Sequence, residues 1–221
     1  MKLLLTSAGL TNKSISKALI DLVGKPPKDT KLAFIPTAAN VEKDDKGWLI
    51  DDLVNVKKQK FISIDLVDIS ALPEDIWLPR LKEVDILLFG GGNTFHLMYW
   101  LNKSGLSRLL PELLKSRVYM GISAGSMIAS SDLSLSLSEK LYYPDGVGEY
   151  KSDQGLGFVD FYIRPHFNSP HFPKVREDYL KETAKNIKET IYALDDNSAV
   201  KVENGNVDVV SEGKYLILNQ I

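Results

Sequence analysis

The sequence lacks cysteine altogether, and its 221 residues include only three histidines. Without cysteine there can be no disulfide, no thiol nucleophile and no thiolate ligand for a metal. No apolar run approaches the roughly 20 residues that a membrane-spanning helix needs. The apolar start at Met1–Leu5 ends too soon for a signal peptide and is better interpreted as a buried strand, so we expect a cytoplasmic protein.

The chain also has little excess charge of either sign. The formal net charge is −2, and no long block of like charges occurs. The charge therefore gives no support for binding to a nucleic acid or to an anionic membrane. The composition, 44% hydrophobic and 25% charged, is ordinary for a globular protein and argues against disorder. We expect one domain over residues 1–221, because no repeat, linker or low-complexity segment divides the chain.

Short apolar runs alternate with amphipathic segments over the first 130 residues. The predicted strands are Leu3–Thr6, Leu32–Ile35, Phe61–Leu66, Val84–Phe89 and Val118–Met120. The predicted helices are Ser14–Val23, Gly47–Val56, Pro73–Leu81, Thr94–Leu101 and Leu106–Leu114. Continuous apolar strands indicate burial on both faces, so the pattern predicts a three-layer α/β fold with a doubly wound, mostly parallel sheet.

The remaining chain has a different pattern. Ser134–Ser138 alternates like a half-exposed strand, and a strand at Val159–Ile163 and a helix at Val175–Ile187 follow. Four short strand-like runs then end the chain, at Thr190–Leu194, Ala199–Val202, Val207–Val210 and Tyr215–Leu218. The hairpin-type turns between them predict an antiparallel C-terminal extension.

One segment indicates chemistry more clearly than the rest. Gly121-Ile122-Ser123-Ala124-Gly125 stands between a strand and a helix start, with the serine at the apex of the turn. A sharp strand–turn–helix of this kind exposes the hydroxyl near the positive end of a helix, which suits a nucleophile. The spacing alone is weak evidence, and its structural context strengthens it.

A second glycine-rich segment, Gly90-Gly91-Gly92-Asn93-Thr94, follows another predicted strand. Its backbone N–H groups could serve an oxyanion hole, with Gly92 and Ala124 each giving one donor. Asn93 or Thr94 could cap the following helix. A phosphate cradle is the competing interpretation, but neither of the usual nucleotide-binding glycine patterns is present.

Three histidines limit the choice of a general base. We favour His166, which follows a strand and is preceded by a rigid proline, with His171 held in reserve and His96 as the third. The spacing of His166 and His171 matches no common metal motif. The carboxylate that would orient the base remains open between Asp196, Asp195, Glu139, Asp145 and Asp153.

Four strings together carry a family resemblance: Gly90–Phe95, Gly121–Ser126, Pro165–Phe167 and Ala193–Asp196. With them the chain resembles the peptidase E (α-aspartyl dipeptidase) family, which is related to cyanophycinases and has a sheet similar to that of class I glutamine amidotransferases. The resemblance implies Ser123 as nucleophile, His166 as base and Asp196 in the position of an acid that is generally glutamate in the family.

The resemblance also implies a substrate. Family members that prefer N-terminal aspartate bind its side chain with a basic residue, and Arg176 has a similar context; Glu139 falls near a family acidic residue. Asn93, Thr94, Glu139 and Arg176 are therefore the candidate substrate-binding residues. We expect a serine dipeptidase that needs no metal or organic cofactor, takes a small peptide and could form a homodimer. The alternatives are hydrolysis of another amide or ester, such as a β-aspartyl peptide, and a non-catalytic binding protein on the same fold.

Overall fold

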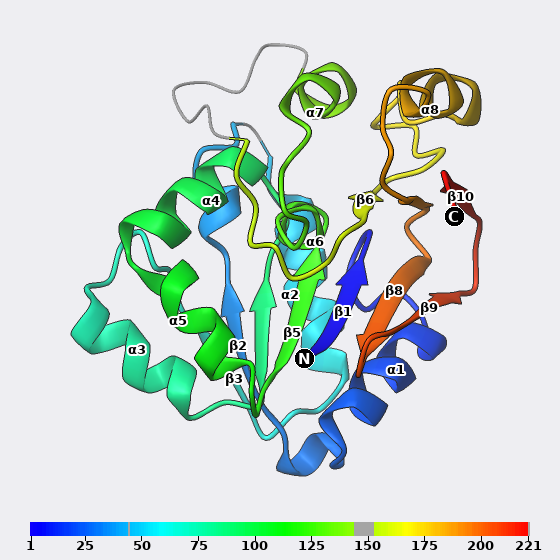
Figure 1. Ribbon diagram of the computed structural model, residues 1–221. Coiled ribbons are helices and arrows are strands. Elements are labelled where there is room, and N and C mark those ends of the chain that lie inside the picture. Colours follow the sequence, from blue (N-terminus) through cyan, green and yellow to red (C-terminus); the bar gives the residue numbers. More distant parts are fainter. Residues whose placement is uncertain (44, 144–152, 221) are drawn as a thin grey trace.

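A computed structural model describes residues 1–43, 45–143 and 153–220, and in it the predicted parallel sheet forms the centre of the molecule (Figure 1). The sheet has seven strands in the order β3-β2-β4-β5-β1-β8-β9. The five strands from the first half of the chain run parallel, and β8 and β9 add antiparallel at one edge. Their bounds are β1 Lys2–Thr6, β2 Lys31–Ile35, β3 Ser63–Leu66, β4 Ile86–Phe89, β5 Val118–Ile122, β8 Ser198–Glu203 and β9 Asn206–Ser211.

Helices cover both faces of this sheet, which gives three layers. One core cluster packs the sheet against α3 (Glu74–Lys82), α4 (Thr94–Lys103) and α5 (Leu106–Leu113). A second cluster packs the other face against α1 (Lys13–Val23) and α2 (Gly47–Lys58). Side chains of β4 and β5 are buried on both faces, as continuous apolar strands require. Short 3-10 turns lie at Pro27–Asp29 (η1) and Thr37–Ala39 (η2).

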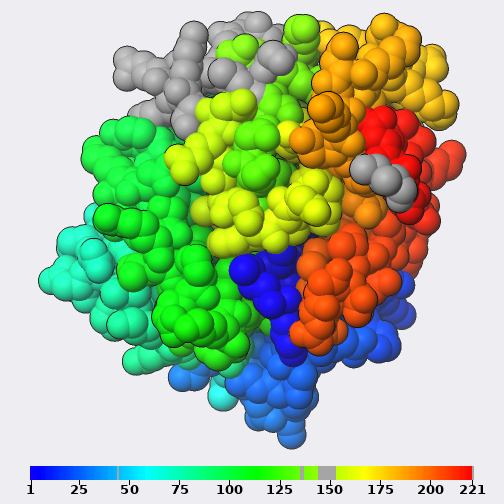
Figure 2. Space-filling view, viewed as in Figure 1, coloured from blue at the N-terminus to red at the C-terminus, as the bar shows by residue number. Residues whose placement is uncertain are grey.

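A smaller three-stranded sheet lies at the carboxyl ends of the parallel strands (Figure 1). It joins β6 (Tyr162–Arg164) in parallel to β7 (Ile191–Leu194), and β10 (Tyr215–Leu218) adds antiparallel. The helix α8 (Glu177–Ala184) packs against it. The yellow surface of the segment before and through β6 lies between the green helices and the orange C-terminal strands in Figure 2, so the later chain closes over the first half.

The antiparallel C-terminal extension is confirmed, but the strand predicted at Ser134–Ser138 is wrong. These residues belong mostly to the helix α7 (Leu135–Tyr142). Leu133, Leu137 and Leu141 are all buried, and their four-residue spacing fits one face of a helix. The serines between them merely imitate strand alternation, and Ser138 donates from its hydroxyl to the carbonyl of Leu133.

In the part of the chain that the structure describes, no helix is long and apolar enough to cross a membrane.

Candidate active site

Ser123 lies at the tip of the turn from β5 into the short helix α6 (Ala124–Met127). Its φ of 48° is unusual for a residue with a side chain. The surrounding bonds hold this conformation: the Ser123 N–H donates to the carbonyl of Thr6 at 3.1 Å, and the Ser123 carbonyl accepts from the N–H groups of Ser126 and Met127. A backbone strained in this way positions the hydroxyl at the end of the central strand.

Two glycines beside Ser123 allow close approach of neighbouring backbone. A Cβ on Gly125 would lie 2.1 Å from the carbonyl oxygen of Phe89, and a Cβ on Gly121 would lie 2.5 Å from the carbonyl oxygen of Gly125. Real Cβ atoms do not approach backbone so closely, so only glycine fits at both positions. Glycines therefore stand two residues before and two residues after Ser123 because the backbone of α6 packs directly on β4 and β5.

The ring of His166 joins Ser123 to Asp196. Nε2 of His166 lies 2.9 Å from Oγ of Ser123, and Nδ1 lies 2.7 Å from Oδ1 of Asp196. His166 follows β6 and Asp196 follows β7, so the second sheet brings both residues over the end of β5. A serine hydroxyl, an imidazole and a carboxylate in this order can transfer a proton away from the hydroxyl as it attacks.

Ser7, directly after β1, holds the other two groups together. Its hydroxyl accepts from the backbone N–H of His166 at 2.8 Å and donates to Oδ1 of Asp196 at 3.0 Å. Burial opposes ionisation of Asp196, but the hydrogen bonds from His166 and Ser7 hold the pKa of its carboxyl below the usual value. Asp196 therefore stays ionised beside the imidazole at neutral pH.

Backbone and ring contacts fix the orientation of His166. Its φ is 62°, again in the left-handed region. Its ring stacks on Phe172, with centroids 4.5 Å apart and planes 13° from parallel. The hydroxyl of Tyr142 donates to the carbonyl of Pro165 just before it. These contacts limit the ring to an orientation in which both nitrogens meet their partners.

Backbone donors stand next to the hydroxyl. Ala124 is the first residue of α6, so its N–H has no carbonyl within the helix, and within the described residues no other acceptor takes it. Gly92 follows β4 with a φ of 124°, and a Cβ there would lie 2.3 Å from the carbonyl oxygen of Ala38. The Gly92 N–H likewise meets no acceptor within the described part of the chain. Both donors could receive a developing negative charge.

Ser123 opens into a cavity of about 690 Å³, here called the Ser123 cavity. Such a volume suits a small molecule or a short peptide. Glycine, aromatic and carboxylate residues from five separate segments surround it. Its lining consists of Ala8, Glu42, Asp45, Gly47, Trp48, Asp51, Asp52, Gly91, Gly92, Thr94, Ile122, Ser123, Met127, Tyr142, Tyr143, His166, Ser169, His171, Phe172 and Asp196.

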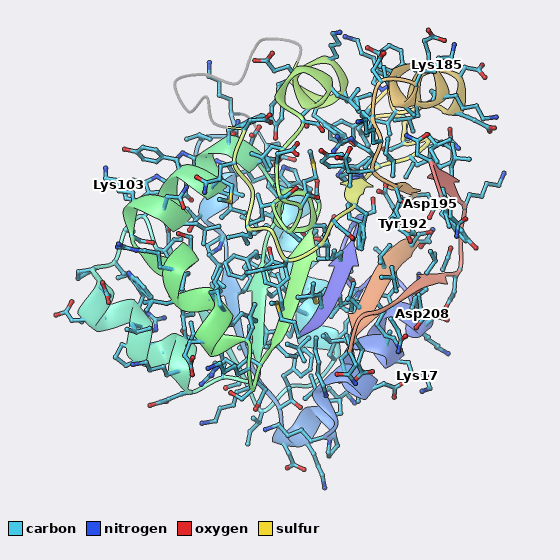
Figure 3. All side chains as sticks on the ribbon, viewed as in Figure 1. Lys17, Lys103, Lys185, Tyr192, Asp195 and Asp208 are labelled. Atoms are coloured by element: carbon cyan, nitrogen blue, oxygen red, sulfur yellow. The ribbon has the colours of Figure 1, made fainter. Side chains whose placement is uncertain are left out.

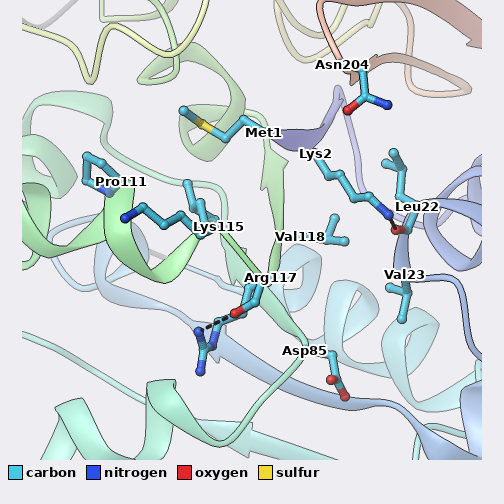
Figure 4. A pocket seen from close by; sticks show the side chains of 12 residues that line it. Met1, Lys2, Leu22, Val23, Asp85, Pro111, Lys115, Arg117, Val118 and Asn204 are labelled. Atoms are coloured by element: carbon cyan, nitrogen blue, oxygen red, sulfur yellow. Dashed lines mark hydrogen bonds between the residues drawn. The ribbon is translucent and has the colours of Figure 1, made fainter.

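A smaller cavity of about 390 Å³ lies at the opposite, amino ends of the strands (Figure 4). Its cationic side chains already have partners within the protein, and Lys115 pairs with Glu112. Lys2 donates to the carbonyl of Leu22, and Arg117 donates to the Ser116 hydroxyl and to carbonyls of α3 and α5. None of the predicted site residues lines it.

Three of the four predicted substrate-binding residues do not line the Ser123 cavity. Asn93 caps α4 by accepting from the N–H of His96, and Glu139 lies on α7 away from the cavity. The Arg176 guanidinium donates to the backbone carbonyls of Ser169, Phe172 and Val175, so its donors hold the loop before α8. Only Thr94 lines the cavity, where its N–H donates to the Tyr143 hydroxyl.

The alternative acids are placed elsewhere. Asp195, labelled in Figure 3, accepts from the Ser198 hydroxyl, the Asn197 N–H and the Lys214 N–H, so it organises the turn before β8. Asp153 is exposed, and Asp145 lies outside the described residues.

Among the described residues, neither alternative histidine hydrogen-bonds to the Ser123 hydroxyl. His96 is buried within α4, where burial lowers its pKa. His171 lines the cavity, yet the contact to Ser123 is made by His166. Among the described residues, no group of three or more histidine, aspartate or glutamate side chains is arranged to hold a metal ion.

Sequence reasoning missed Ser7, Trp48, Asp52 and Phe172. Ser7 follows a strand neighbouring β5, and that position is a usable signal. Trp48 and Asp52 lie in an ordinary amphipathic helix, and Phe172 lies in a loop, so no pattern marked them.

Comparison with known proteins decides the family. The model of peptidase family S51 matches residues 3–210, which is nearly the whole chain. The chain belongs to peptidase family S51. Its relatives include an uncharacterized peptidase of Pasteurella multocida, 28% identical over 80% of this chain and 83% of that protein. Peptidase E of Streptomyces coelicolor is 29% identical over 86% of this chain and 74% of that protein.

Solved structures share the fold of this S51 protein. A candidate peptidase E protein from Listeria monocytogenes superposes with a TM-score of 0.79, covering 96% of this chain and 98% of that one at 21% identity. A peptidase from an acI-B1 actinobacterium superposes with a TM-score of 0.72, covering 98% and 90% at 21% identity. At this identity the two structures establish the peptidase E-like α/β fold alone.

Proposed function

We propose that this S51 peptidase is a serine dipeptidase whose nucleophile is Ser123. The observation that carries the proposal is the continuous hydrogen-bonded series from Ser123 through His166 to Asp196 at the floor of a cavity of about 690 Å³. Family membership supports peptide hydrolysis. The geometry supports the serine type, because the hydroxyl has a base in contact and the base has a carboxylate in contact.

The reaction follows from these positions. Oγ of Ser123 attacks the peptide carbonyl carbon while Nε2 of His166 takes the hydroxyl proton. The carbonyl π electrons move to oxygen, where the N–H groups of Ala124 and Gly92 receive the charge. As the tetrahedral species collapses, the C–N bond breaks and the leaving amine takes the proton from His166. Water then attacks the acyl-serine ester with the same base, which releases the acid and restores the hydroxyl.

Asp196 acts on His166 rather than on the substrate. Its carboxylate accepts from Nδ1, which selects the tautomer with a free Nε2 lone pair and stabilises the ring when it becomes positive. Aspartate reaches less far than the glutamate usual in the family. Here the carboxylate still reaches the ring, and the Ser7 hydroxyl holds it there.

The preference for N-terminal aspartate stays a prediction from the resemblance. It needs a cation beside the substrate side chain, and Arg176 is committed to three backbone carbonyls. Hydrolysis of other amides or esters, including β-aspartyl peptides, remains a variant of the same chemistry.

A dipeptide panel with varied first residues tests the proposal. We expect at least one dipeptide to be cleaved and the Ser123→Ala variant to lose at least about 10³-fold in kcat. Turnover that survives in Ser123→Ala would contradict the nucleophile. Absence of turnover across the panel, with ligands that still raise the melting temperature, would favour a binding protein.

A further inference from the structure

The helix α2 forms the wall of the Ser123 cavity on one side of the nucleophile. Trp48 and Asp52 are one helical turn apart and both line the cavity. A Cβ on Gly91 would lie 3.6 Å from both Cβ of Ser123 and Cζ3 of Trp48, so the indole edge and the nucleophile flank the same small space beside that glycine. Trp48 is 39% exposed and lines the cavity, so part of its aromatic side chain is accessible to a ligand.

Asp52 lies deeper along the same wall. A Cβ on Gly9 would lie 3.0 Å from Cδ1 of Ile122 and 3.4 Å from Oδ1 of Asp52. The Asp52 carboxylate therefore lies near the side chain of Ile122, the residue before the nucleophile. Within the described residues no hydrogen bond or ion pair reaches it. Burial, with a further contribution from the charge of Asp51, raises the pKa of Asp52 to about 7.

The lining of the cavity has an unbalanced charge. Five carboxylates line it, and none of the described lining residues is lysine or arginine. Asp196 is paired with His166, and Glu42 has Asn93 and Lys46 beside it. The carboxylates without a positive partner among the described residues are Asp45 and Asp51, which are exposed at the rim, and Asp52, which is partly buried.

Resting on the proposed function, we propose that Trp48 and Asp52 select dipeptides whose first residue has a basic side chain. In a dipeptidase the first residue contributes the attacked carbonyl, so its side chain starts next to Ser123, and the proposal places that side chain against the α2 wall. A lysine or arginine stem can pack on the indole while its charge meets the ring face and a carboxylate. An aspartate side chain would instead enter among like charges, so this inference and the aspartate preference implied by the resemblance exclude each other.

The α-ammonium group, which every dipeptide has, does not account for this wall by itself. One ammonium needs one carboxylate, whereas three lack a partner and an aromatic surface stands beside them. Two positive charges on the first residue match the arrangement better. A bound cation would also favour the ionised form of Asp52, so uptake of a basic substrate should release a proton near neutral pH.

The test compares kcat/KM for Lys-Leu, Arg-Leu, Leu-Leu and Asp-Leu. The proposal predicts that the two basic dipeptides are cleaved at least tenfold faster than Leu-Leu and that Asp-Leu is the slowest. Asp52→Asn should lower the Lys-Leu to Leu-Leu ratio at least tenfold, mainly through KM. Asp75→Asn, which removes an exposed carboxylate of α3 far from the cavity, should leave that ratio unchanged.

A charge-reversal variant distinguishes a change of specificity from a simple loss of folding. Asp52→Lys should raise the Asp-Leu to Lys-Leu ratio above that of the wild type, which a misfolded variant cannot do. Equal rates for all four dipeptides, or fastest cleavage of Asp-Leu, would overturn this inference while leaving the serine mechanism in place. If Ser123 neither reacts with a fluorophosphonate probe nor supports any turnover, the proposed function fails and the inference fails with it.

Discussion

Ser7 and Asp196 are 189 residues apart in the sequence, yet the Ser7 hydroxyl donates to the same Oδ1 that faces the ring of His166. The same hydroxyl accepts from the backbone N–H of His166. One buried side chain after β1 therefore sets the distance between the two residues that the second sheet supplies. Through these two hydrogen bonds the end of the N-terminal strand helps to position the proposed base and its carboxylate.

Loss of the Ser7 hydroxyl should impair orientation rather than substrate binding. We expect Ser7→Ala to lower kcat about tenfold with little change in KM, because Asp196 and the His166 backbone each lose a partner. Steady-state kinetics on a cleaved dipeptide measures the effect. Ser130→Ala is the matched control, since it removes another buried serine hydrogen bond, to the carbonyl of Phe161, away from the site. An equal fall in kcat for both variants would contradict a positioning role.

The two cavity histidines should behave differently when replaced. His166→Ala should lower kcat at least about 10³-fold, because the base is lost. His171→Ala should change kcat by no more than about threefold, because His166 is the histidine that contacts Ser123. Equal losses in the two variants, measured on the same dipeptide, would count against His166 as the sole base.

The raised pKa of Asp52 predicts a pH-dependent gain in stability when it is replaced. Between the unfolded pKa of 3.8 and about 7, the folded protein keeps a proton that the unfolded chain has lost. The group therefore costs stability as the pH rises through that interval, and the cost is complete above it. Asp52→Asn should raise the melting temperature by a few degrees at pH 8 and leave it unchanged near pH 3.5.

Other titratable groups line the same cavity, so the comparison needs a control. They are Glu42, Asp45, Asp51, His166, His171 and Asp196. Asp75→Asn on the exposed face of α3 should show no pH-dependent shift. A constant gain for Asp52→Asn at both pH values would show that its carboxylate titrates normally.

A methyl group beside the nucleophile should disrupt the fold. Gly125→Ala places its Cβ 2.1 Å from the carbonyl oxygen of Phe89, so we expect a loss of about 3 kcal/mol or more, measured by urea unfolding. Gly205→Ala provides the contrast: its φ of +83° is unfavourable for alanine, whereas Gly125 has no positive φ, and nothing lies within 4 Å of a Cβ at Gly205, so about 1 kcal/mol is expected. A loss at Gly125 no larger than that at Gly205 would show that the contact with the Phe89 carbonyl does not constrain this position.

The sequence predicted the first half of the fold well because its signals are local. Continuous apolar runs such as Ile86–Phe89 require burial on both faces, and glycine and serine turns follow them directly. The position of Ser123 follows from that pattern. The wrong prediction at Ser134–Ser138 has a local cause as well. Leucine stands at every second position of this segment, which is typical of a strand, but the run also contains leucines four residues apart, which is typical of a helix.

The rest of the site depends on contacts that no local pattern records. Asp195 and Asp196 are adjacent, and only the packing of the turn before β8 decides which carboxylate faces His166. Trp48 and Asp52 belong to a helix whose role depends on which strand ends it covers. Arg176 has the expected context, but the loop carbonyls around it take its donors.

Covalent labelling tests the central claim most directly. A fluorophosphonate probe reacts with an activated serine, and mass spectrometry of the digested protein identifies the modified residue. We predict a single adduct on Ser123, absent from Ser123→Ala and strongly slowed in His166→Ala. An adduct on another serine, or labelling that is undiminished in Ser123→Ala, would contradict the account.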